Sequence, residues 1–232
     1  MIAFSVIIPF RDRGTDPLRK QNLDRVLRHW WNADQAPMVV ADGGKGNSQF
    51  NRSKAYNIGV NMTAADVLVF AESDIIVPHD QMNNAIHAAY DYPGLVIPFT
   101  DYYALTPQAS EWVRNGEMEP QYAATDMWIT GGGSFGAVNV MSRETYERVG
   151  QFDEAFCGSW YDDTAMKRAF ELTSGPLRYV NGPAYHLYHL PGWSGDHLTD
   201  EDKAATERNK RRYEAYMAAQ TTDQILHLTA GN

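Results

Sequence analysis

The sequence has almost no cysteine, no long apolar run and no excess of basic charge. Cys157 is the only cysteine among 232 residues, which excludes a disulfide within the chain and is typical of a reducing cytoplasm. No apolar run approaches the length that spans a bilayer, and the first ten residues lack the basic start of a secretory signal. The formal net charge of -9 disfavours nonspecific binding to nucleic acid or to membranes. We therefore expect a cytoplasmic protein that has no membrane partner.

The first hundred residues predict a parallel α/β sheet. Strands are expected at Phe4–Pro9, Met38–Ala41 and Val67–Phe70, where short runs of β-branched and aromatic residues occur. Asp16 precedes a proline, a pair that is typical of a helix start, and a second helix is expected from Phe50. The order strand, helix, strand, helix, strand implies parallel strands that are joined by right-handed crossovers.

The second half of the chain carries weaker signals. Further strands are expected at Leu95–Phe99, Phe135–Met141 and Leu177–Val180, and further helices at Ser142–Val149 and from Asp162. Poor periodicity between Thr100 and Thr130 predicts an irregular excursion that forms part of an acceptor surface. The segment from Thr199 to Gln220 begins acidic and becomes basic, which suits a helix dipole and predicts a helical tail.

Two carboxylates interrupt the most apolar part of the sequence. Glu72, Ser73 and Asp74 separate the run that ends at Phe70 from a second run that begins at Ile75. A carboxylate inside a core is costly unless a cation, a hydrogen-bond donor or solvent accompanies it. Ligands of open parallel sheets bind at the carboxyl ends of the strands, where this pair suits a hard divalent ion that also binds a diphosphate. An ordinary acidic turn is the alternative.

Two histidines lie three residues apart near the end of the predicted sheet. His186 and His189 converge on one metal ion if the segment between them turns. Together with Asp74 they make one carboxylate and two imidazoles, a set that suits a first-row divalent ion with positions left open for phosphate oxygens. The alternative is one buried histidine that has its hydrogen bonds satisfied and one exposed histidine.

Arginines lie at the edges of the predicted strands of this acidic protein. Arg11, Arg13 and Arg52 are positioned to pair with phosphate oxygens in bidentate fashion, and solvated surface arginines are the alternative. Asp42 ends the second strand and precedes two glycines. It either forms hydrogen bonds to a nucleoside or initiates a turn.

A pair of aspartates begins a predicted helix. Asp162 and Asp163 follow the aromatic residues Trp160 and Tyr161. A carboxylate at a helix N-terminus is stabilised by the helix dipole, so helix capping is one interpretation. The other is a general base beside an aromatic side chain that faces a sugar ring.

Five segments of the sequence resemble glycosyltransferases. IIPFRDR from Ile7, FNRSKAYNIGV from Phe50 and FAESDIIVP from Phe70 resemble the first half of the β-1,4-galactosyltransferase family. The segment GGGSFGAVNVMSRETYERVGQFDEAFCGSWYDD from Gly131 is similar to the second half that this family shares with polypeptide N-acetylgalactosaminyltransferases. AYHLYHLPGW from Ala184 resembles the HLWHP ending of small phage and bacterial glycosyltransferases. Together the resemblance runs from Phe4 to Trp193 and includes a phage-encoded origin among its implications.

The resemblance implies the GT-A fold, in which a nucleotide-binding half joins an acceptor half. It places a single domain at 1–198, with a nucleotide-sugar half at 1–99 and an acceptor half at 100–198, followed by the helical tail at 199–232. It also implies a nucleotide-sugar donor, usually a UDP-sugar, and a manganese-like ion, for which magnesium is the alternative. The acceptor is a hydroxyl of a glycan, a protein or a modified nucleic acid.

Roles carried over from the family attach to particular residues. Asp74 matches the last acid of the DxD-type metal motif, and Asp163 and Asp162 match a base and an acceptor-binding acid. Nucleotide contacts and the remaining metal ligands fall on Pro9, Phe10, Arg11, Arg13, Phe50, Arg52, His186 and His189. Two positions depart from the family pattern, since Glu72 replaces an aspartate and Ser159 replaces a mobile tryptophan, with Trp160 one place later.

The reaction implied by the galactosyltransferase-like segments is an inverting sugar transfer, with Asp163 accepting the acceptor proton. The N-acetylgalactosaminyltransferases retain configuration, so both stereochemical outcomes stay open. A nucleotide-sugar-binding protein without transfer activity is one alternative function. A nucleotidyltransferase is another, with the glycine-rich loop that starts at Gly43 as its triphosphate site.

Overall fold

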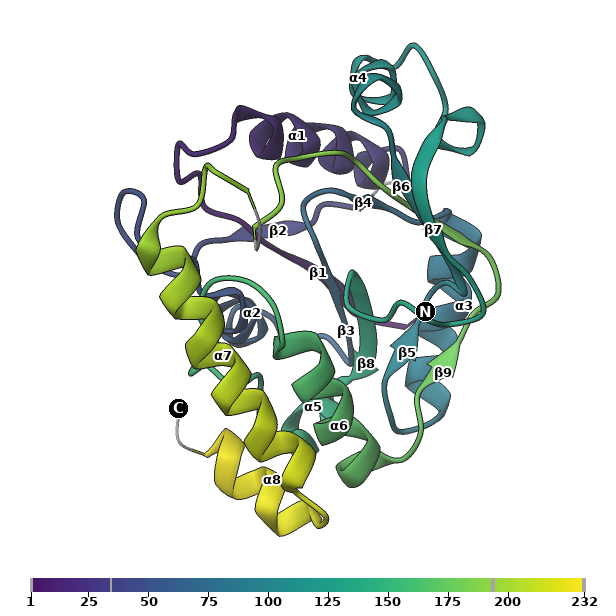
Figure 1. Ribbon diagram of the computed structural model, residues 1–232. Coiled ribbons are helices and arrows are strands. Elements are labelled where there is room, and N and C mark those ends of the chain that lie inside the picture. Colours follow the sequence, from purple (N-terminus) through teal and green to yellow (C-terminus); the bar gives the residue numbers. More distant parts are fainter. Residues whose placement is uncertain (1, 34, 193–194, 231–232) are drawn as a thin grey trace.

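A six-stranded sheet forms the centre of the protein (Figure 1). The computed structural model describes residues 2–33, 35–192 and 195–230, so Trp193, where the family resemblance ends, lies outside the described residues. The sheet has the order β2-β1-β3-β8-β5-β9. Its strands are β1 (Phe4–Pro9), β2 (Met38–Val40), β3 (Val67–Ala71), β5 (Val96–Ile97), β8 (Val138–Ser142) and β9 (Arg178–Tyr179). Only the pairs that involve β8 are antiparallel, so the expected α/β fold with a mostly parallel central sheet is confirmed.

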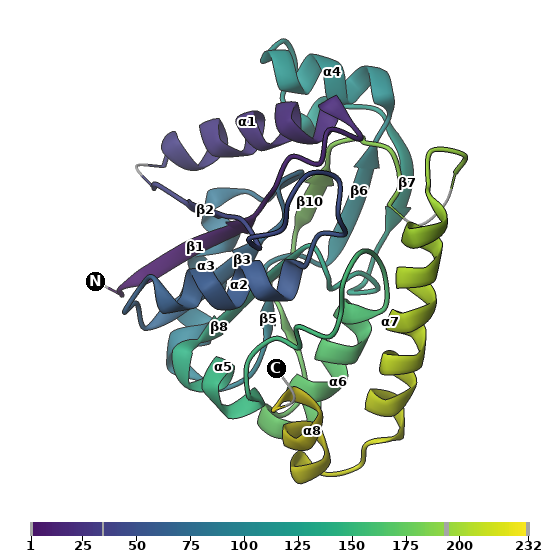
Figure 2. The same ribbon diagram turned by 90° about the vertical axis from the view of Figure 1, so that its left-hand side faces the viewer.

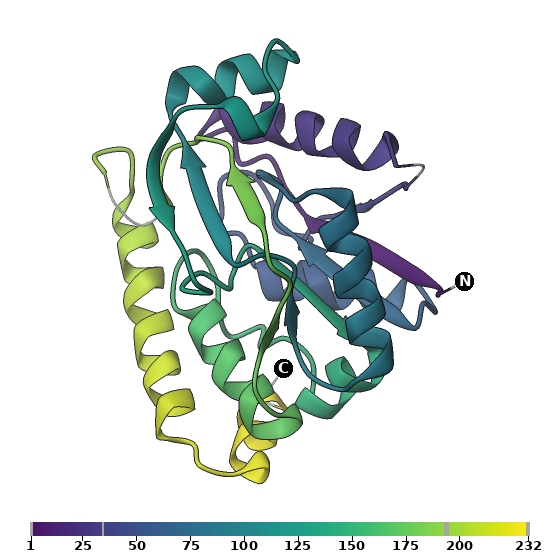
Figure 3. The same ribbon diagram turned by 90° about the vertical axis from the view of Figure 1, so that its right-hand side faces the viewer.

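Helices on both sides bury the central strands. All five residues of β3 are buried, which explains why this strand reads as a continuous apolar run. The opposite views in Figures 2 and 3 show α2 (Arg52–Asn61) on one side of the sheet and α3 (His79–Asp91) on the other. Gly59 permits close packing of α2 on β1, because a Cβ at this position would collide with the Ile7 side chain.

Side-chain caps set the starts of several helices. Asp16 accepts a hydrogen bond from the backbone N–H of Leu18 and begins α1 (Pro17–Trp31), as predicted. Ser142 caps α5 (Arg143–Val149), and α6 (Asp162–Ser174) also begins at the predicted residue. The helix predicted from Phe50 starts at Arg52 instead, because the side chain of Asn51 caps it by accepting from the N–H of Lys54.

A second sheet corrects the prediction of an irregular excursion at residues 100–130. It has four strands in the order β4-β10-β6-β7, and two of them lie in this segment. The four are β4 (Ile75–Ile76), β6 (Asp101–Leu105), β7 (Thr125–Ile129) and β10 (Pro183–His186), and α4 (Pro107–Asn115) connects β6 to β7. Most residues of β6 and β7 are only partly buried or exposed, so their sequence lacks the apolar alternation by which strands are recognised.

The C-terminal tail is helical, as predicted, and it packs against the rest of the chain. Helices α7 (Asp200–Ala218) and α8 (Thr222–Thr229) lie beside α5 and α6 in all three views (Figures 1–3). Tyr216 of α7 and Ile225 of α8 are fully buried. Within the described ranges, no helix is long and apolar enough to cross a membrane.

Candidate functional site

The carboxyl ends of β1, β2 and β3 meet at one edge of the sheet, because these three strands are parallel. Arg11 follows β1, Asp42 follows β2, and the turn Glu72-Ser73-Asp74 follows β3. Asp74 is 3% exposed, and its carbonyl oxygen accepts from the N–H of Leu187 at 2.8 Å. This edge is where open α/β sheets bind ligands, so the predicted site residues of the first half do converge.

Asp74, His186 and His189 come together, as the sequence predicted. Strand β10 pairs with β4 so that His186 lies opposite Ile75, one residue from Asp74. The Nε2 atom of His186 lies 3.6 Å from Asp74 Oδ1, and Nε2 of His189 lies 3.0 Å from Oδ2. One atom from each of the three side chains lies within 4.8 Å of the other two, which is close enough for one ion. We call these three residues the aspartate–histidine cluster.

The hydrogen bonding of the aspartate–histidine cluster suits a cation. His189 donates from Nδ1 to the carbonyl of Leu190 at 2.7 Å, which fixes its ring so that Nε2 faces Asp74 Oδ2 at 3.0 Å. Burial lowers the pKa of His186 to about 4, so this ring is neutral at pH 7 and can offer a lone pair. Asp74 Oδ1 is buried and has no hydrogen-bond partner. Because an unpartnered buried carboxylate oxygen is costly, the donor set fits a bound divalent ion.

Buried polar residues hold the segment that carries the histidines. Asn22, which is fully buried on α1, donates from Nδ2 to the carbonyl of Tyr188 at 3.2 Å. The N–H of Tyr188 donates to Ser110 Oγ at 2.8 Å, and that of Leu190 donates to Asp16 Oδ2 at 2.7 Å. Neither Asn22 nor Ser110 was among the predicted site residues. For Asn22 the available signal was a polar residue on the buried face of a predicted helix, whereas Ser110 lies in the segment that was predicted to be irregular.

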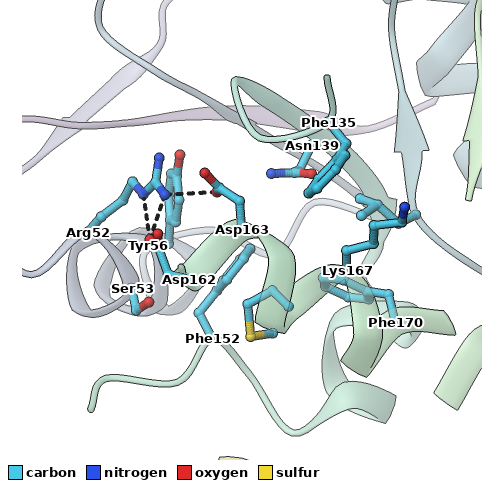
Figure 4. A pocket seen from close by; sticks show the side chains of 12 residues that line it. Arg52, Ser53, Tyr56, Phe135, Asn139, Phe152, Asp162, Asp163, Lys167 and Phe170 are labelled. Carbon is cyan, nitrogen blue, oxygen red and sulfur yellow. Dashed lines mark hydrogen bonds and ion pairs between the residues drawn. The ribbon is translucent and has the colours of Figure 1, made fainter. Parts of the chain in front are cut away.

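A second charged cluster lies on the other side of the same turn, and we call it the arginine–carboxylate cluster. Arg52 pairs with Glu72 through Nη1, with Asp162 through Nε and Nη2 at 3.0 and 2.5 Å, and with Asp163 through Nη2 at 2.8 Å. Figure 4 shows the guanidinium of Arg52 on α2 facing both aspartates at the start of α6. Arg52 is largely buried and pairs with three carboxylates. It is therefore not a solvated surface arginine, which was the alternative interpretation of this residue.

The two aspartates of this cluster differ in their surroundings. Asp162 is 7% exposed, and its Oδ1 is buried without a hydrogen-bond partner. The side chain of Asp163 is 37% exposed. Partial burial raises the pKa of its carboxyl, although the charge of Arg52 acts to lower it. Gly136 leaves room for the Asp163 carboxylate, because a Cβ at Gly136 would lie 2.5 Å from Oδ2. Asp163 is therefore the more open of the two and the better placed to meet another molecule.

Arg11 and Arg13 bind a loop of their own chain. Arg11 donates to Asp42 Oδ1 at 2.8 Å and to the carbonyls of Gly46 and Ser48, at 2.6 and 2.9 Å. Arg13 donates to the carbonyl of Asn47 at 2.8 Å. These contacts shape the loop at residues 43–49, which we call the donor loop. The expected phosphate contacts of both arginines stay predictions.

The remaining predicted nucleotide contacts surround the donor loop. Asp42 is buried and also accepts from the backbone N–H groups of Gly44 and Asn51, so it acts as a turn former here. These hydrogen bonds and the one from Arg11 lower the pKa of Asp42, although its burial works in the other direction. Phe50 lies under the guanidinium of Arg11, 5.9 Å from the ring centroid.

Three other predicted residues differ widely in exposure. Pro9 is buried at the end of β1, and Phe10 is half-buried and donates its N–H to the carbonyl of Val40 at 2.9 Å. Trp160, by contrast, is 51% exposed directly before α6, where a bound molecule can reach it. Of these three, only the side chain of Trp160 offers a large surface to a ligand.

Comparison with known proteins places the fold. No family model and no curated protein sequence matches the chain. Among solved structures, a mutant of Drosophila β1,4-galactosyltransferase 7 in complex with manganese, UDP-galactose and xylobiose is similar, with a TM-score of 0.53 and 13% identity. The match covers 96% of this chain and 84% of that one.

A second similar structure comes from Mycobacterium tuberculosis. It is glucosyl-3-phosphoglycerate synthase in complex with Mn2+, UDP-glucose and phosphoglyceric acid, with a TM-score of 0.53, 13% identity, and coverage of 97% of this chain and 80% of that one. Both are GT-A glycosyltransferases. The chain therefore has the GT-A fold, as the resemblance in its sequence implied.

Proposed function

We propose that the protein is a metal-dependent glycosyltransferase that moves a sugar from a nucleotide-sugar donor to a hydroxyl acceptor. The observation that carries this proposal is the aspartate–histidine cluster, with its unpartnered Asp74 oxygen, beside the arginine–carboxylate cluster at the ligand-binding edge of a GT-A sheet. The two similar structures contain Mn2+ with UDP or a UDP-sugar, which supports a divalent ion and a UDP-sugar donor here.

The charge balance of the site supports a metal requirement. Asp74, Glu72, Asp162 and Asp163 outnumber the guanidinium groups of Arg52 and of Arg19, whose charge acts on Asp74, so the centre has a negative excess. Such a centre repels a bare diphosphate. A divalent ion held by Asp74, His186 and His189 would remove this repulsion and offset the charge that develops on the leaving diphosphate. Manganese is proposed, with magnesium as the alternative.

Asp163 is proposed as the general base. Its carboxylate is partly exposed and its raised pKa makes it a stronger proton acceptor than a surface aspartate, while Arg52 keeps it ionised and oriented. Asp162 is more buried and is proposed to hold the acceptor hydroxyl. Trp160, exposed next to this pair, offers an aromatic face to a sugar ring. Inversion is proposed, in which the base and the leaving diphosphate lie on opposite sides of the sugar.

The donor loop favours sugar transfer over nucleotidyl transfer. Loops that bind a triphosphate direct backbone N–H groups at the phosphates. Here the carbonyls of Gly46, Asn47 and Ser48 turn inward to Arg11 and Arg13. The nature of the acceptor, whether a glycan, a protein or a modified nucleic acid, and the cytoplasmic and phage-encoded origin stay predictions.

The proposal is tested by identifying the product. The purified protein is incubated with UDP- and GDP-sugars and Mn2+ or Mg2+, and free nucleoside diphosphate and pyrophosphate are measured separately. We expect slow release of UDP from one sugar donor, faster release when the acceptor is added, and loss of both in EDTA. Release of pyrophosphate would instead identify a nucleotidyltransferase. Tight donor binding without any product would identify a binding protein, and full activity in EDTA would contradict the metal requirement.

A further inference from the structure

The loop before α6 has an unusual backbone. Gly158, Trp160 and Tyr161 have φ values of +84°, +80° and +74°. Side chains other than glycine rarely adopt this left-handed region, because the Cβ comes too close to the carbonyl oxygen that follows it. Two consecutive residues in this conformation persist only when their surroundings hold them there. We call residues 157–161 the acceptor loop, since it leads directly into Asp162 and Asp163.

A single buried side chain from the C-terminal tail holds the acceptor loop. Asn209 of α7 is 1% exposed. Its Nδ2 lies 3.1 Å from the carbonyl oxygen of Cys157 and 3.2 Å from those of Ser159 and Trp160, and it donates to them. Its Oδ1 accepts from the N–H of Cys157 at 3.2 Å. Asn209 thus contacts four backbone groups of one five-residue loop, with its two amide hydrogens shared among three carbonyls.

Neighbouring residues on the same face of α7 also pack against the acceptor loop. The ring of Tyr213, one turn after Asn209, lies 5.3 Å from the ring of Tyr161. Ala205 fills the space beside Gly158, where an added Cβ would come within 3.2 Å of the Ala205 Cβ. The acceptor loop is therefore shaped by side chains that come from helix α7 of the C-terminal tail.

The start of α7 binds the donor loop. Asp202, two turns before Asn209, accepts from Gln49 Nε2 at 2.6 Å and from Arg13 Nη2 at 3.2 Å. Figures 1 and 2 show α7 running beside α6, the helix that begins with the two aspartates. One helix face thus contacts both loops that border the site, Asp202 the donor loop and Asn209 the acceptor loop.

We propose that Asn209 is a positioning residue for the transfer reaction, which makes helix α7 part of the active site. Asn209 holds the carbonyls of Cys157, Ser159 and Trp160 and so fixes the left-handed backbone of the loop. This backbone presents Trp160 to the acceptor and fixes the position of Asp163 at the start of α6. Without Asn209, the loop relaxes to ordinary φ values and the start of α6 loses its alignment. The inference rests on the proposed function for its catalytic part, whereas the hold on the loop is independent of it.

Asn209→Ala and the milder Asn209→Ser test the proposal, with Lys210→Ala, an exposed neighbour on α7, as the matched control. Hydrogen exchange measured by mass spectrometry reports on the loop without any substrate. We expect faster exchange at residues 157–163 in both Asn209 variants and unchanged exchange in β3. We also expect turnover of the acceptor to fall about 10- to 100-fold, the usual cost of a misplaced reacting group, with donor KM unchanged.

Asp202→Asn sharpens the test, because it should raise donor KM and leave exchange in the acceptor loop unchanged. Unchanged exchange at residues 157–163 in the Asn209 variants would overturn the proposal, whatever the activity. A freed loop with normal acceptor turnover would overturn it too. Faster exchange across the whole chain would show a general structural role instead. If the wild-type protein transfers no sugar, the proposed function fails, and the exchange data still decide whether Asn209 holds the loop.

Discussion

The two charged clusters on either side of the Glu72–Asp74 turn satisfy their polar groups in opposite ways. In the arginine–carboxylate cluster, the protein supplies its own cation, and Arg52 pairs with all three carboxylates. In the aspartate–histidine cluster, the ring of His186 is neutral, and one oxygen of Asp74 has no hydrogen-bond partner. Each cluster keeps one buried carboxylate oxygen without a hydrogen-bond partner, Asp162 Oδ1 in the first and Asp74 Oδ1 in the second, but only the first contains a cation of the protein itself. On the proposed function, the second takes its cation from solution.

On the proposed function, this difference separates metal binding from general-base catalysis, two tasks that place opposite demands on the residues that perform them. A metal ion needs lone pairs that face one point, and an arginine among them would repel it. A general base needs an adjustable pKa, which burial and a nearby guanidinium provide at Asp163. On the proposed function, three consecutive residues serve both tasks, because the side chains of Glu72 and Asp74 point to different clusters.

The largest expected effect follows from removing the carboxylate that faces the two histidines. Asp74→Asn should abolish metal-dependent turnover and weaken Mn2+ binding, measured by calorimetry, by about 100-fold or more. The metal-free variant should melt at the same temperature as the wild type or higher, because a buried charge without a full partner is lost. Asp24→Asn, an exposed aspartate of α1, is the control. Unchanged Mn2+ binding in Asp74→Asn would break the distinction between the clusters.

A smaller effect is expected from the arginine–carboxylate cluster. Asp163→Asn should reduce turnover by about 10²–10⁴-fold, the usual contribution of a positioned proton acceptor, and leave donor and Mn2+ binding unchanged. Asp162→Asn should instead raise the acceptor KM. Single-turnover rates at saturating donor distinguish the two. The reverse pattern would exchange their roles, and full activity in both variants would favour a retaining mechanism.

Arg52→Gln should have the smallest effect and test two roles at once. As a phosphate contact, Arg52 would contribute roughly 1.5–3 kcal/mol to donor binding, which calorimetry measures. As the partner of Asp163, it lowers the pKa of a carboxyl that burial raises. Its removal should therefore raise that pKa further, so that the acid limb of the kcat/KM profile moves to higher pH. An unmoved acid limb together with weaker donor binding would leave only the phosphate role.

The local part of the fold was predictable because its signals are local. The cap at Asp16, the run at Val67–Phe70 and the paired aspartates at the start of α6 each act over a few residues, and each appears in the structure as predicted. The grouping of Asp74 with His186 and His189 was predictable from their residue types and the three-residue spacing of the histidines, although the antiparallel pairing of β10 with β4 that brings them together was not.

What the sequence determined by itself was therefore the strands and helices of the first half, the GT-A class and the residue types of the site. The tertiary structure alone decided which groups neutralise one another. It paired β6 with β10, about eighty residues away, and brought Asn209 from the tail to the acceptor loop. It also placed Arg52 where its guanidinium forms ion pairs with three carboxylates. Such contacts leave no periodic trace, because a half-buried strand or a lone buried amide is specified by distant partners and not by its neighbours in the chain.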